Sequence, residues 1–387
     1  MYVFDSLRGA MMLLGIVLHS AACYMTVPTE PRFFPMQETE KAFAFDILVF
    51  LIHAFRMPLF FLMAGLFARM TMERRGWQGF LRQRMVRLGV PLMLFLPPLL
   101  LLTRHYALAM GVPPDDLVFH FSVFWFLYFL LVFTLVVAVL VAAGLPAGVL
   151  DGVFAKIWFS LWRWPLLIAV TGCLLWTQYA GTLEPESTLT PHWAIPTTYA
   201  LFYLTGWQLF PHRESVSQWE RYAGRYLVVA AILLFPYLGC IDELVKAYNR
   251  EATPLIRASW SIPEPIHTVA AMLGAGLVWC LIFGITGLFV RYGSRPTQTG
   301  AYLAGAAYWV YLTHFFAVLV LCNALRTSSM PVFAKFAIVL AGATAFAFGT
   351  YELLVRRRPW AWLFGAASST ATAVAGSESA SSLLRAR

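Results

Sequence analysis

Residues 47–67 read ILVFLIHAFRMPLFFLMAGLF, a run of 21 residues whose only ionisable side chains are those of His53 and Arg56. A run of this length is long enough to cross the roughly 30 Å hydrocarbon layer of a bilayer as an α-helix. Comparable runs recur along the 387 residues, of which 60% are hydrophobic and 12% are charged. A soluble domain carries about 25% charged residues, so this composition excludes a water-soluble globular protein. It also excludes a disordered chain, because 16% of the residues are aromatic.

We expect ten membrane-spanning helices, because in lipid only a helix satisfies every backbone amide and carbonyl within its own segment. The expected spans cover residues 7–27, 42–67, 88–103, 121–143, 164–181, 193–210, 226–241, 266–290, 301–325 and 330–354. The predicted fold class is therefore an all-α polytopic membrane protein, with one membrane domain over residues 1–364. Residues 365–387 are rich in alanine and small polar residues, which predicts a disordered cytoplasmic tail.

The net charge of +9 is divided unequally between the two sides of the expected spans. The side that holds both termini carries 19 Lys and Arg residues, and the opposite side carries seven. Positive flanks are retained in the cytoplasm. We therefore expect both termini to be cytoplasmic and the protein to lie in a bacterial inner membrane, with lipids rather than nucleic acid around it. The first span also resembles a signal segment, but His19 would be unusual in a discarded apolar core, so we expect no cleavage.

The five cysteines all fall within apolar runs, and no two of them have the CxxC or CxxH spacing of a metal or redox site. We therefore expect small buried apolar residues rather than a disulfide, and no metal site. These residues are Cys23, Cys173, Cys240, Cys280 and Cys322.

Ionisable side chains inside the expected spans are candidates for function, because each costs several kcal/mol in lipid unless it is paired or hydrated. His19 follows Arg8 by 11 residues, which places it roughly 16 Å further along the first helix, near the middle of the membrane. A core histidine bonded to a neighbouring helix is an equally good interpretation of His19.

The second and ninth spans hold further candidates. His53 and Arg56 are three residues apart and share a helix face. A guanidinium at this depth needs an anion or a water-filled cavity. Pairing with Asp46 is the alternative, but Asp46 lies nearly three turns away along the same helix, so we do not expect this pair. His314, with Tyr311 nearby, could close the same cavity or could have a packing role.

Two groups of residues lie near the expected membrane surfaces. Trp125 begins the fourth span at the outer interface, where an aromatic-belt role is the default. Residues 69–87 form an expected cytoplasmic loop with six arginines and one glutamate, which favours retention and contact with anionic lipids. Within it, Arg84 and Arg87 are expected at the start of a helix, facing one way, an arrangement that can bind phosphates.

The order of several motifs resembles the integral-membrane acyltransferase family 3, over about residues 1–364. The motifs are Asp5-Ser-Leu-Arg-Gly, His19-Ser, His53-Ala-Phe-Arg-Met-Pro-Leu-Phe-Phe to Gly65, Arg84-Met-Val-Arg-Leu-Gly-Val-Pro, Trp125-Phe-Leu, Tyr308-Trp-Val-Tyr-Leu-Thr-His314 and Tyr351-Glu. Within the family, the chain is similar to the glucan biosynthesis branch. One departure is Ala64 before Gly65, where the family often has Ser or Thr, so a hydroxyl role there is absent.

The resemblance implies ten or so helices and an acyltransferase with a catalytic His19 and Arg8. It also implies that an acyl group moves from cytoplasmic acyl-CoA, a co-substrate, to a hydroxyl of a glycan beyond the membrane, and that Arg84 and Arg87 match the family's Arg-x-x-Arg. No bound cofactor is expected. The glucan branch implies succinyl transfer, but the residues themselves do not distinguish succinyl from acetyl.

In the expected mechanism His19 removes the proton of the sugar hydroxyl. Arg56 or Arg8 would stabilise the oxyanion of the thioester. Arg84 and Arg87 would hold the phosphates of coenzyme A. An acyl-histidine intermediate is an alternative route. The main rival function is a transporter or flippase for an anionic or glycan substrate, in which His53, Arg56 and His314 line the path. A structural membrane protein is a third.

Overall fold

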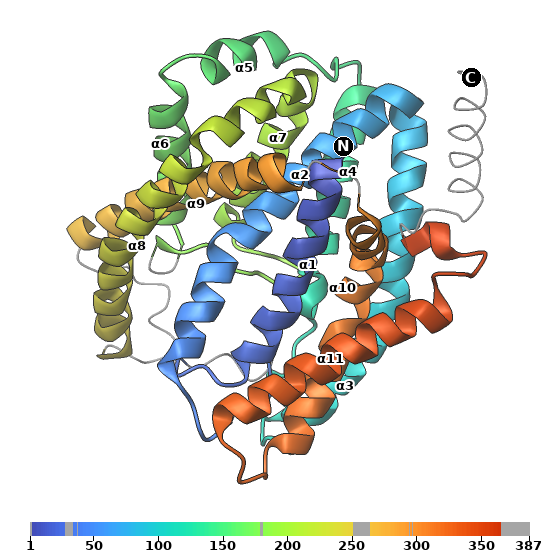
Figure 1. Cartoon of the computed structure of the whole chain (residues 1–387), viewed down its shortest axis with the longest axis vertical. Helices are drawn as coiled ribbons and strands as arrows, with labels where there is room; N and C mark the ends of the chain where they lie inside the picture. Colours follow the sequence, from blue (N-terminus) through green and yellow to red (C-terminus); the bar gives the residue numbers. More distant parts are fainter. Residues whose placement is uncertain are drawn as a thin grey trace, which may run out of the picture. The chain divides into compact units, whose positions relative to one another are not determined.

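The computed structural model describes residues 2–27, 34–36, 38–178, 181–250, 264–293, 295 and 297–364 (Figure 1). The predicted disordered tail at 365–387 lies outside the described residues. The helices are α1 Tyr2–Ala22, α2 Phe43–Arg84, α3 Val90–Ala109, α4 Trp125–Ala142, α5 Asp151–Trp158, α6 Arg163–Trp176, α7 Ala194–Leu209, α8 Gln218–Arg250, α9 Glu264–Tyr292, α10 Gln298–Leu325 and α11 Val332–Leu354. Short helical turns are η1 Met85–Gly89, η2 Pro114–Asp116, η3 Ser122–Phe124, η5 Phe210–Ser217 and η7 Ala361–Phe364. The described residues contain no β-strand, which confirms the all-α class.

Seven helical segments of the described chain are long and apolar enough to cross a membrane. The count becomes eight if α5 and α6, which meet at a 109° bend, form one broken span. Two of the seven segments are unusually long, with 67 residues over Phe43–Ala109 and 53 residues over Ala194–Lys246. Each of these long segments contains two of the ten expected spans. The polytopic membrane fold is therefore confirmed, and the number ten stays a prediction.

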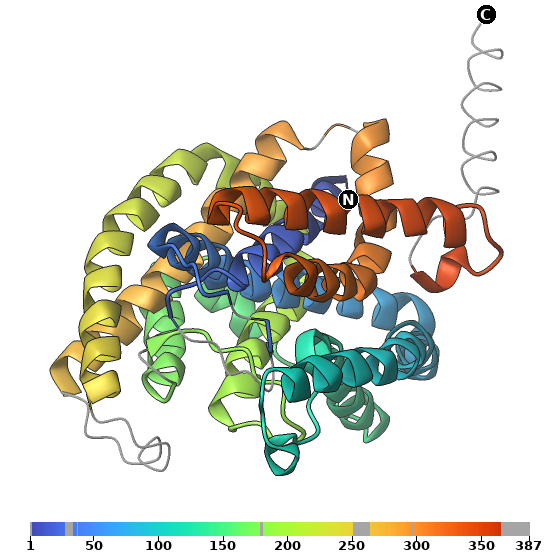
Figure 2. The ribbon, with the colours of Figure 1, turned by 90° about the horizontal axis from the view of Figure 1, so that it is seen from below.

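The chain divides into two compact units, each assembled from separate stretches of sequence. Unit 1 comprises Met1–Val49, Gly89–Val118 and Arg295–Arg387. Within it α10 packs against α1, α3, α11 and η7, and α1 lies beside α10 in both views (Figures 1 and 2). The two helices run parallel, because the start of α1 meets the start of α10 and the same holds for their ends. Gly9 permits the close approach, since a Cβ there would lie 3.0 Å from the Cβ of Leu303.

Unit 2 comprises Phe50–Leu88 and Phe119–Ser294. In this unit α8 lies along α9, and α6 packs against both α9 and α7 (Figure 1). Tyr237 of α8 is buried in the core between α8 and α9, and its hydroxyl donates to the carbonyl oxygen of Gly181 at 3.0 Å. Helices α2 and α7 cross in backbone contact, because a Cβ at Gly65 would overlap the carbonyl oxygen of Tyr203 and one at Gly206 would overlap that of Leu62.

Candidate active site

His19 lies in the last turn of α1, on the side that faces α10. The helix is continuous over Tyr2–Ala22, so Arg8 and His19 are separated by roughly 16 Å along its axis. The His19 ring is partly exposed. Its centroid lies 5.3 Å from that of His314 and 5.1 Å from that of Phe315. Unit 1 therefore brings together two histidines that the sequence places in different spans.

His314 is fully buried in α10. Its Nδ1 lies 2.7 Å from the carbonyl oxygen of Val310, one turn earlier. Because a carbonyl oxygen only accepts hydrogen bonds, Nδ1 carries a proton, and Nε2 is the nitrogen that can take up another. Tyr311 is also buried and precedes His314 by three residues, so both lie toward one side of α10. We call the two imidazoles of His19 and His314, together with Tyr311 on the same side of α10, the histidine pair site.

Arg8 lies at the other end of the contact between α1 and α10. Its Nη2 donates to the carbonyl oxygen of Ala304 at 3.0 Å and lies 3.3 Å from the carboxylate of Asp5. The rise between Arg8 and His19 exceeds the reach of an arginine side chain, about 7 Å at full extension from its Cα. Arg8 therefore does not contact the ring of His19, although both residues lie in unit 1.

His53 and Arg56 lie on the part of α2 that belongs to unit 2. The Nε2 of His53 is 2.9 Å from the carbonyl oxygen of Leu183, so this nitrogen donates. Arg56 is buried, with its guanidinium carbon 5.4 Å from the ring centroid of Phe60 and an Nη atom 3.8 Å from the sulfur of Met57. A cation over an aromatic face is stabilised by the ring quadrupole, which supports a charge at this buried position.

Asp46, at the start of α2 in unit 1, accepts hydrogen bonds from two residues that follow the end of α1. The backbone amide of Thr26 donates to its carboxylate at 2.9 Å, the Thr26 hydroxyl at 2.8 Å and the backbone amide of Val27 at 2.9 Å. Three such bonds hold the carboxylate in place. Asp46 therefore ties the start of α2 to the residues that follow α1.

Trp125 is buried at the first turn of α4 in unit 2. Its ring lies 5.0 Å from that of Tyr199, 5.5 Å from that of Phe129 and 6.0 Å from that of Phe61. The side chain thus belongs to an aromatic cluster between α2, α4 and α7 in the interior of unit 2. Its surroundings differ from those of a belt tryptophan, which faces lipid and water.

The prediction of a loop over residues 69–87 is wrong. The segment is helical almost throughout, since α2 continues to Arg84 with a break at Gly76, where φ is 65°. Arg84 and Arg87 also do not lie at the start of a helix, because Arg84 ends α2 and Arg87 lies in η1, a π-helical turn before α3. Both side chains are partly exposed. The positive-inside count reports the charge of a segment and carries no information on whether the segment is coiled or helical.

Arg69 is distinguished from the other arginines of this segment by burial, with a side chain only 6% exposed. Its Nε donates to the Glu73 carboxylate at 2.7 Å and its Nη2 to that of Asp151 at 3.0 Å. It also donates to the carbonyl oxygen of Ala147 and lies 5.5 Å from the ring centroid of Trp207. Arg69 therefore ties α2 to α5 within unit 2, whereas Arg74, Arg75 and Arg82 are exposed.

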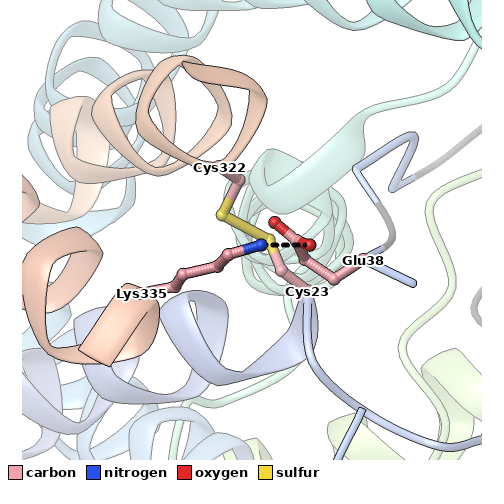
Figure 3. The surroundings of a disulfide bond; sticks show 4 residues. All are labelled: Cys23, Glu38, Cys322 and Lys335. Atoms are coloured by element: carbon pink, nitrogen blue, oxygen red, sulfur yellow. Dashed lines mark hydrogen bonds and ion pairs between the residues drawn. A yellow bond between two sulfur atoms is a disulfide. The ribbon is translucent and has the colours of Figure 1, made fainter. Parts of the chain in front are cut away.

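The prediction that all five cysteines are isolated apolar residues is also wrong. Cys23 and Cys322 form a disulfide in unit 1 between the end of α1 and the last turn of α10 (Figure 3). The two residues are 299 positions apart, so no local spacing reveals the bond. The only signal in the sequence is that both lie near the ends of spans that cross in the same direction. Of the others, Cys280 is buried, Cys240 is partly exposed and Cys173 is exposed.

A second link that the sequence did not reveal lies beside the disulfide. Lys335 of α11 donates to the carboxylate of Glu38 at 3.0 Å, and the two side chains are 3% and 2% exposed (Figure 3). The backbone amide of Glu38 donates to the carbonyl oxygen of Cys23 at 3.1 Å. Burial, together with the nearby Glu38 charge, raises the pKa of the Tyr24 hydroxyl, which therefore stays protonated at neutral pH.

The predicted site residues thus fall into two sets. Unit 1 holds His19, His314, Tyr311 and, at its other end, Arg8. Unit 2 holds His53, Arg56, Arg84, Arg87 and Trp125. Within the described part of the chain, no three His, Cys, Asp or Glu residues are placed to hold a metal ion.

Comparison with known proteins assigns the chain to a class. A family model described as an acyltransferase domain, Acyl_transf_3, matches residues 1–352. The chain therefore belongs to this family and is a membrane acyltransferase.

Among individual proteins, the chain is 31% identical over 100 residues to the glucans biosynthesis protein C of Shigella dysenteriae serotype 1 (strain Sd197). The same identity over the same length relates it to proteins of that name from Salmonella paratyphi B (strain ATCC BAA-1250 / SPB7) and Salmonella enteritidis PT4 (strain P125109). Each match spans 26% of this chain and 25% of the relative. No solved structure matches.

Proposed function

We propose that this acyltransferase moves an acyl group from cytoplasmic acyl-CoA to a hydroxyl of a glycan on the far side of the inner membrane, with both termini cytoplasmic. The observation that carries the proposal is the histidine pair site. An imidazole on a membrane helix, 5.3 Å from a second imidazole that is fully buried, is a costly arrangement in lipid. In a protein of an acyltransferase family, it is suited to proton transfer.

In the proposed reaction His19 acts as the general base. Its neutral imidazole takes the proton of the acceptor hydroxyl as the oxygen attacks the thioester carbonyl, and the imidazolium returns that proton to the departing thiolate of coenzyme A. The carbon–sulfur bond breaks and an ester bond forms, so charge and protons balance. An acyl-histidine intermediate is the alternative route. We assign His314 and Tyr311 to binding the acceptor hydroxyl beside His19.

The two arginines first considered for the oxyanion have different surroundings. Arg8 lies too far along α1 to meet an oxyanion formed at His19, so we assign Arg8 to the donor side, near Asp5. For Arg56 the role of a positive charge that stabilises the oxyanion stays a prediction, and its guanidinium is buried over the ring of Phe60 within unit 2. His53 is assigned to holding substrate on the same helix face, and Trp125 to the aromatic wall of that part of unit 2.

Acyl-CoA binding is assigned to Arg84 and Arg87. Coenzyme A carries phosphates, and guanidinium groups bind phosphate oxygens through paired N–H donors. The partial exposure of both arginines and their place at a π-helical turn support this assignment, because such turns occur often at functional sites. Arg69 is not included, since Glu73 and Asp151 already bind it.

The acceptor is proposed from the relatives' name alone. Proteins called glucans biosynthesis protein C share a quarter of their length with this chain, which favours a glucan hydroxyl. The acyl group is acetyl or succinyl. A transporter or flippase is less well supported, because membership of an acyltransferase family calls for a donor that a transporter does not need.

His19→Ala should abolish acyl transfer, because general acid–base catalysis contributes about 10²–10⁴-fold. The measurement incubates membranes with labelled acetyl-CoA or succinyl-CoA and analyses the periplasmic glycans by mass spectrometry. The matched control is His105→Ala, since His105 is an exposed histidine of α3 in the same unit. Transfer at the native rate by a well-expressed His19→Ala protein would remove His19 from the mechanism. Glycan masses that are identical with and without the gene would favour transport.

A further inference from the structure

The disulfide and the histidine pair site lie on the same two helices. Cys23 follows His19 by four residues, and Cys322 follows His314 by eight. Residues four and eight apart on an α-helix lie close to one face. The bond therefore joins the faces of α1 and α10 that carry the two imidazoles, about one turn beyond His19 and two turns beyond His314.

The bond fixes one end of the contact between α1 and α10. At the opposite end, Arg8 donates to the carbonyl oxygen of Ala304, and between the two ends the ring of His19 contacts the rings of His314 and Phe315. Ring contacts of this kind are individually weak. A covalent bond at one end restricts sliding and tilting of the two helices far more strongly.

The disulfide is also shielded. Cys23 and Cys322 are 1% and 2% exposed. Residues that follow α1 lie over the bond. The amide of Glu38 donates to the carbonyl oxygen of Cys23, and Lys335 binds the Glu38 carboxylate (Figure 3). The amide of Ala42 donates to the carbonyl oxygen of Tyr24 at 3.1 Å. Reductants therefore reach the sulfur atoms only when this cover opens.

The position of the bond agrees with the orientation proposed above. Both sulfurs lie at the C-terminal ends of α1 and α10, which are the extracytoplasmic ends in that orientation. Disulfides form in oxidising compartments such as the bacterial periplasm and are rare in the cytosol. The two helices are parallel, so one compartment can oxidise both cysteines.

We propose that Cys23 and Cys322 are positioning residues, whose disulfide forms on the extracytoplasmic side and holds His19 and His314 at the separation needed for acyl transfer. This inference rests on the proposed function of the histidine pair site. In the oxidation step the two thiols exchange with the disulfide of a thiol-oxidising protein. One intramolecular S–S bond forms here, and the oxidant's disulfide is reduced to two thiols.

The first experiment counts thiols in the full-length protein. Membranes are quenched with acid, denatured and treated with a maleimide polymer that adds a fixed mass to each free thiol. The three remaining cysteines give three additions without reductant and five after reduction. The variant with Cys23→Ala and Cys322→Ala gives three in both cases. Five additions from the unreduced native protein would overturn the proposal.

The second experiment separates positioning from mere stability. The purified protein is first blocked with N-ethylmaleimide while the bond is intact, and then reduced. Turnover should fall at least about tenfold with the KM for acyl-CoA changed less than about twofold, because small displacements of catalytic groups reduce rates strongly. A bifunctional reagent that bridges the two new thiols should restore turnover in the presence of reductant, whereas monofunctional N-ethylmaleimide should not. Full turnover by the reduced, monodisperse protein would overturn the positioning role.

The two experiments also separate this inference from the proposed function. If the oxidised native protein transfers no acyl group from either donor, the proposed function fails and the positioning role fails with it. A count of three additions would then still show the disulfide. If transfer occurs but is indifferent to reduction, the function stands and only the positioning role is contradicted.

Discussion

Glu38 and Lys335 form an ion pair with almost no exposed surface, since their side chains are 2% and 3% exposed. Removing two charges from water is expensive, and their attraction offsets that expense only while both partners are present. A single substitution therefore leaves an unpaired buried charge, and a double substitution by apolar residues does not.

We predict that Glu38→Leu or Lys335→Met alone destabilises the protein by about 3–5 kcal/mol, and that the double variant recovers most of this loss. The measurement is thermal unfolding of the detergent-solubilised proteins in a double-mutant cycle. Lys246→Met is the matched control, because Lys246 pairs with Asp242 on the surface, where both side chains are more than half exposed. Exposed pairs contribute little to stability, so this variant should unfold like the native protein. A double variant less stable than either single variant would contradict the prediction.

At the residue scale, the sequence identified the histidines but not their partners. His19 and His314 are recognisable because ionisable side chains stand out in apolar runs, although the sequence left open whether His314 closes a cavity or has a packing role. Their contact depends on the parallel packing of α1 and α10, which no local pattern encodes. Cys23 and Cys322 were missed for the same reason, since a cysteine in an apolar run has the same appearance whether or not a partner lies across the helix interface.

At the scale of the elements, the crossing of α2 and α7 depends on two glycines. Gly65 and Gly206 each lie against the backbone of the other helix, so a methyl group at either position would overlap a carbonyl oxygen. Small residues at such crossings allow the close backbone approach that drives helix packing in membranes. The glycine that follows Ala64 thus has a structural role, independent of the hydroxyl that the family often has before it.

We predict that Gly65→Ala and Gly206→Ala each reduce the yield of folded protein and destabilise it by at least about 1–3 kcal/mol, because the helices must separate. Fluorescence-detected size-exclusion chromatography and thermal unfolding provide the measurement. Gly239→Ala in α8 is the matched control, since nothing lies within 4 Å of a Cβ there. Alanine has the higher helix propensity by about 1 kcal/mol, so this variant should be as stable as the native protein or more stable. Equal stability of all three variants would argue against the crossing.

The existence of the helices was predicted better than their limits. Apolar runs mark the residues that can lie in lipid, so most expected spans coincide with a helix, as 301–325 does with α10. Helices that continue beyond the lipid leave no such mark. This is why α2 extends to Arg84 through a segment expected to be a loop, and why α8 covers Gln218–Arg250 instead of 226–241.

At the scale of the whole molecule, the direction of α1 and α10 connects the fold to the proposed topology. Two parallel helices cross a membrane in the same direction, which requires an odd number of crossings between them. The sequence predicts the same result, because the first and ninth expected spans, which correspond to α1 and α10, cross the membrane in the same direction. The unequal distribution of Lys and Arg then indicates which end of both helices is cytoplasmic.

The class of protein was also accessible from sequence, because the motifs that identify the family lie in order over most of the chain. The division into two compact units was not. Each unit combines segments from distant parts of the sequence, and single-span hydrophobicity has no information on which helices associate. One membrane domain over residues 1–364 therefore stays a prediction.

The most direct test of the central claim is a sided assay for transfer through His19. Inverted membrane vesicles, with the cytoplasmic face outside, are loaded with a glucan oligosaccharide and supplied externally with labelled acetyl-CoA or succinyl-CoA. We predict that label appears on the enclosed oligosaccharide in native vesicles and in vesicles with the His105→Ala protein, and that it is absent with His19→Ala. Labelling of oligosaccharide only when it is added outside, or equal labelling by the His19→Ala protein, would contradict the account.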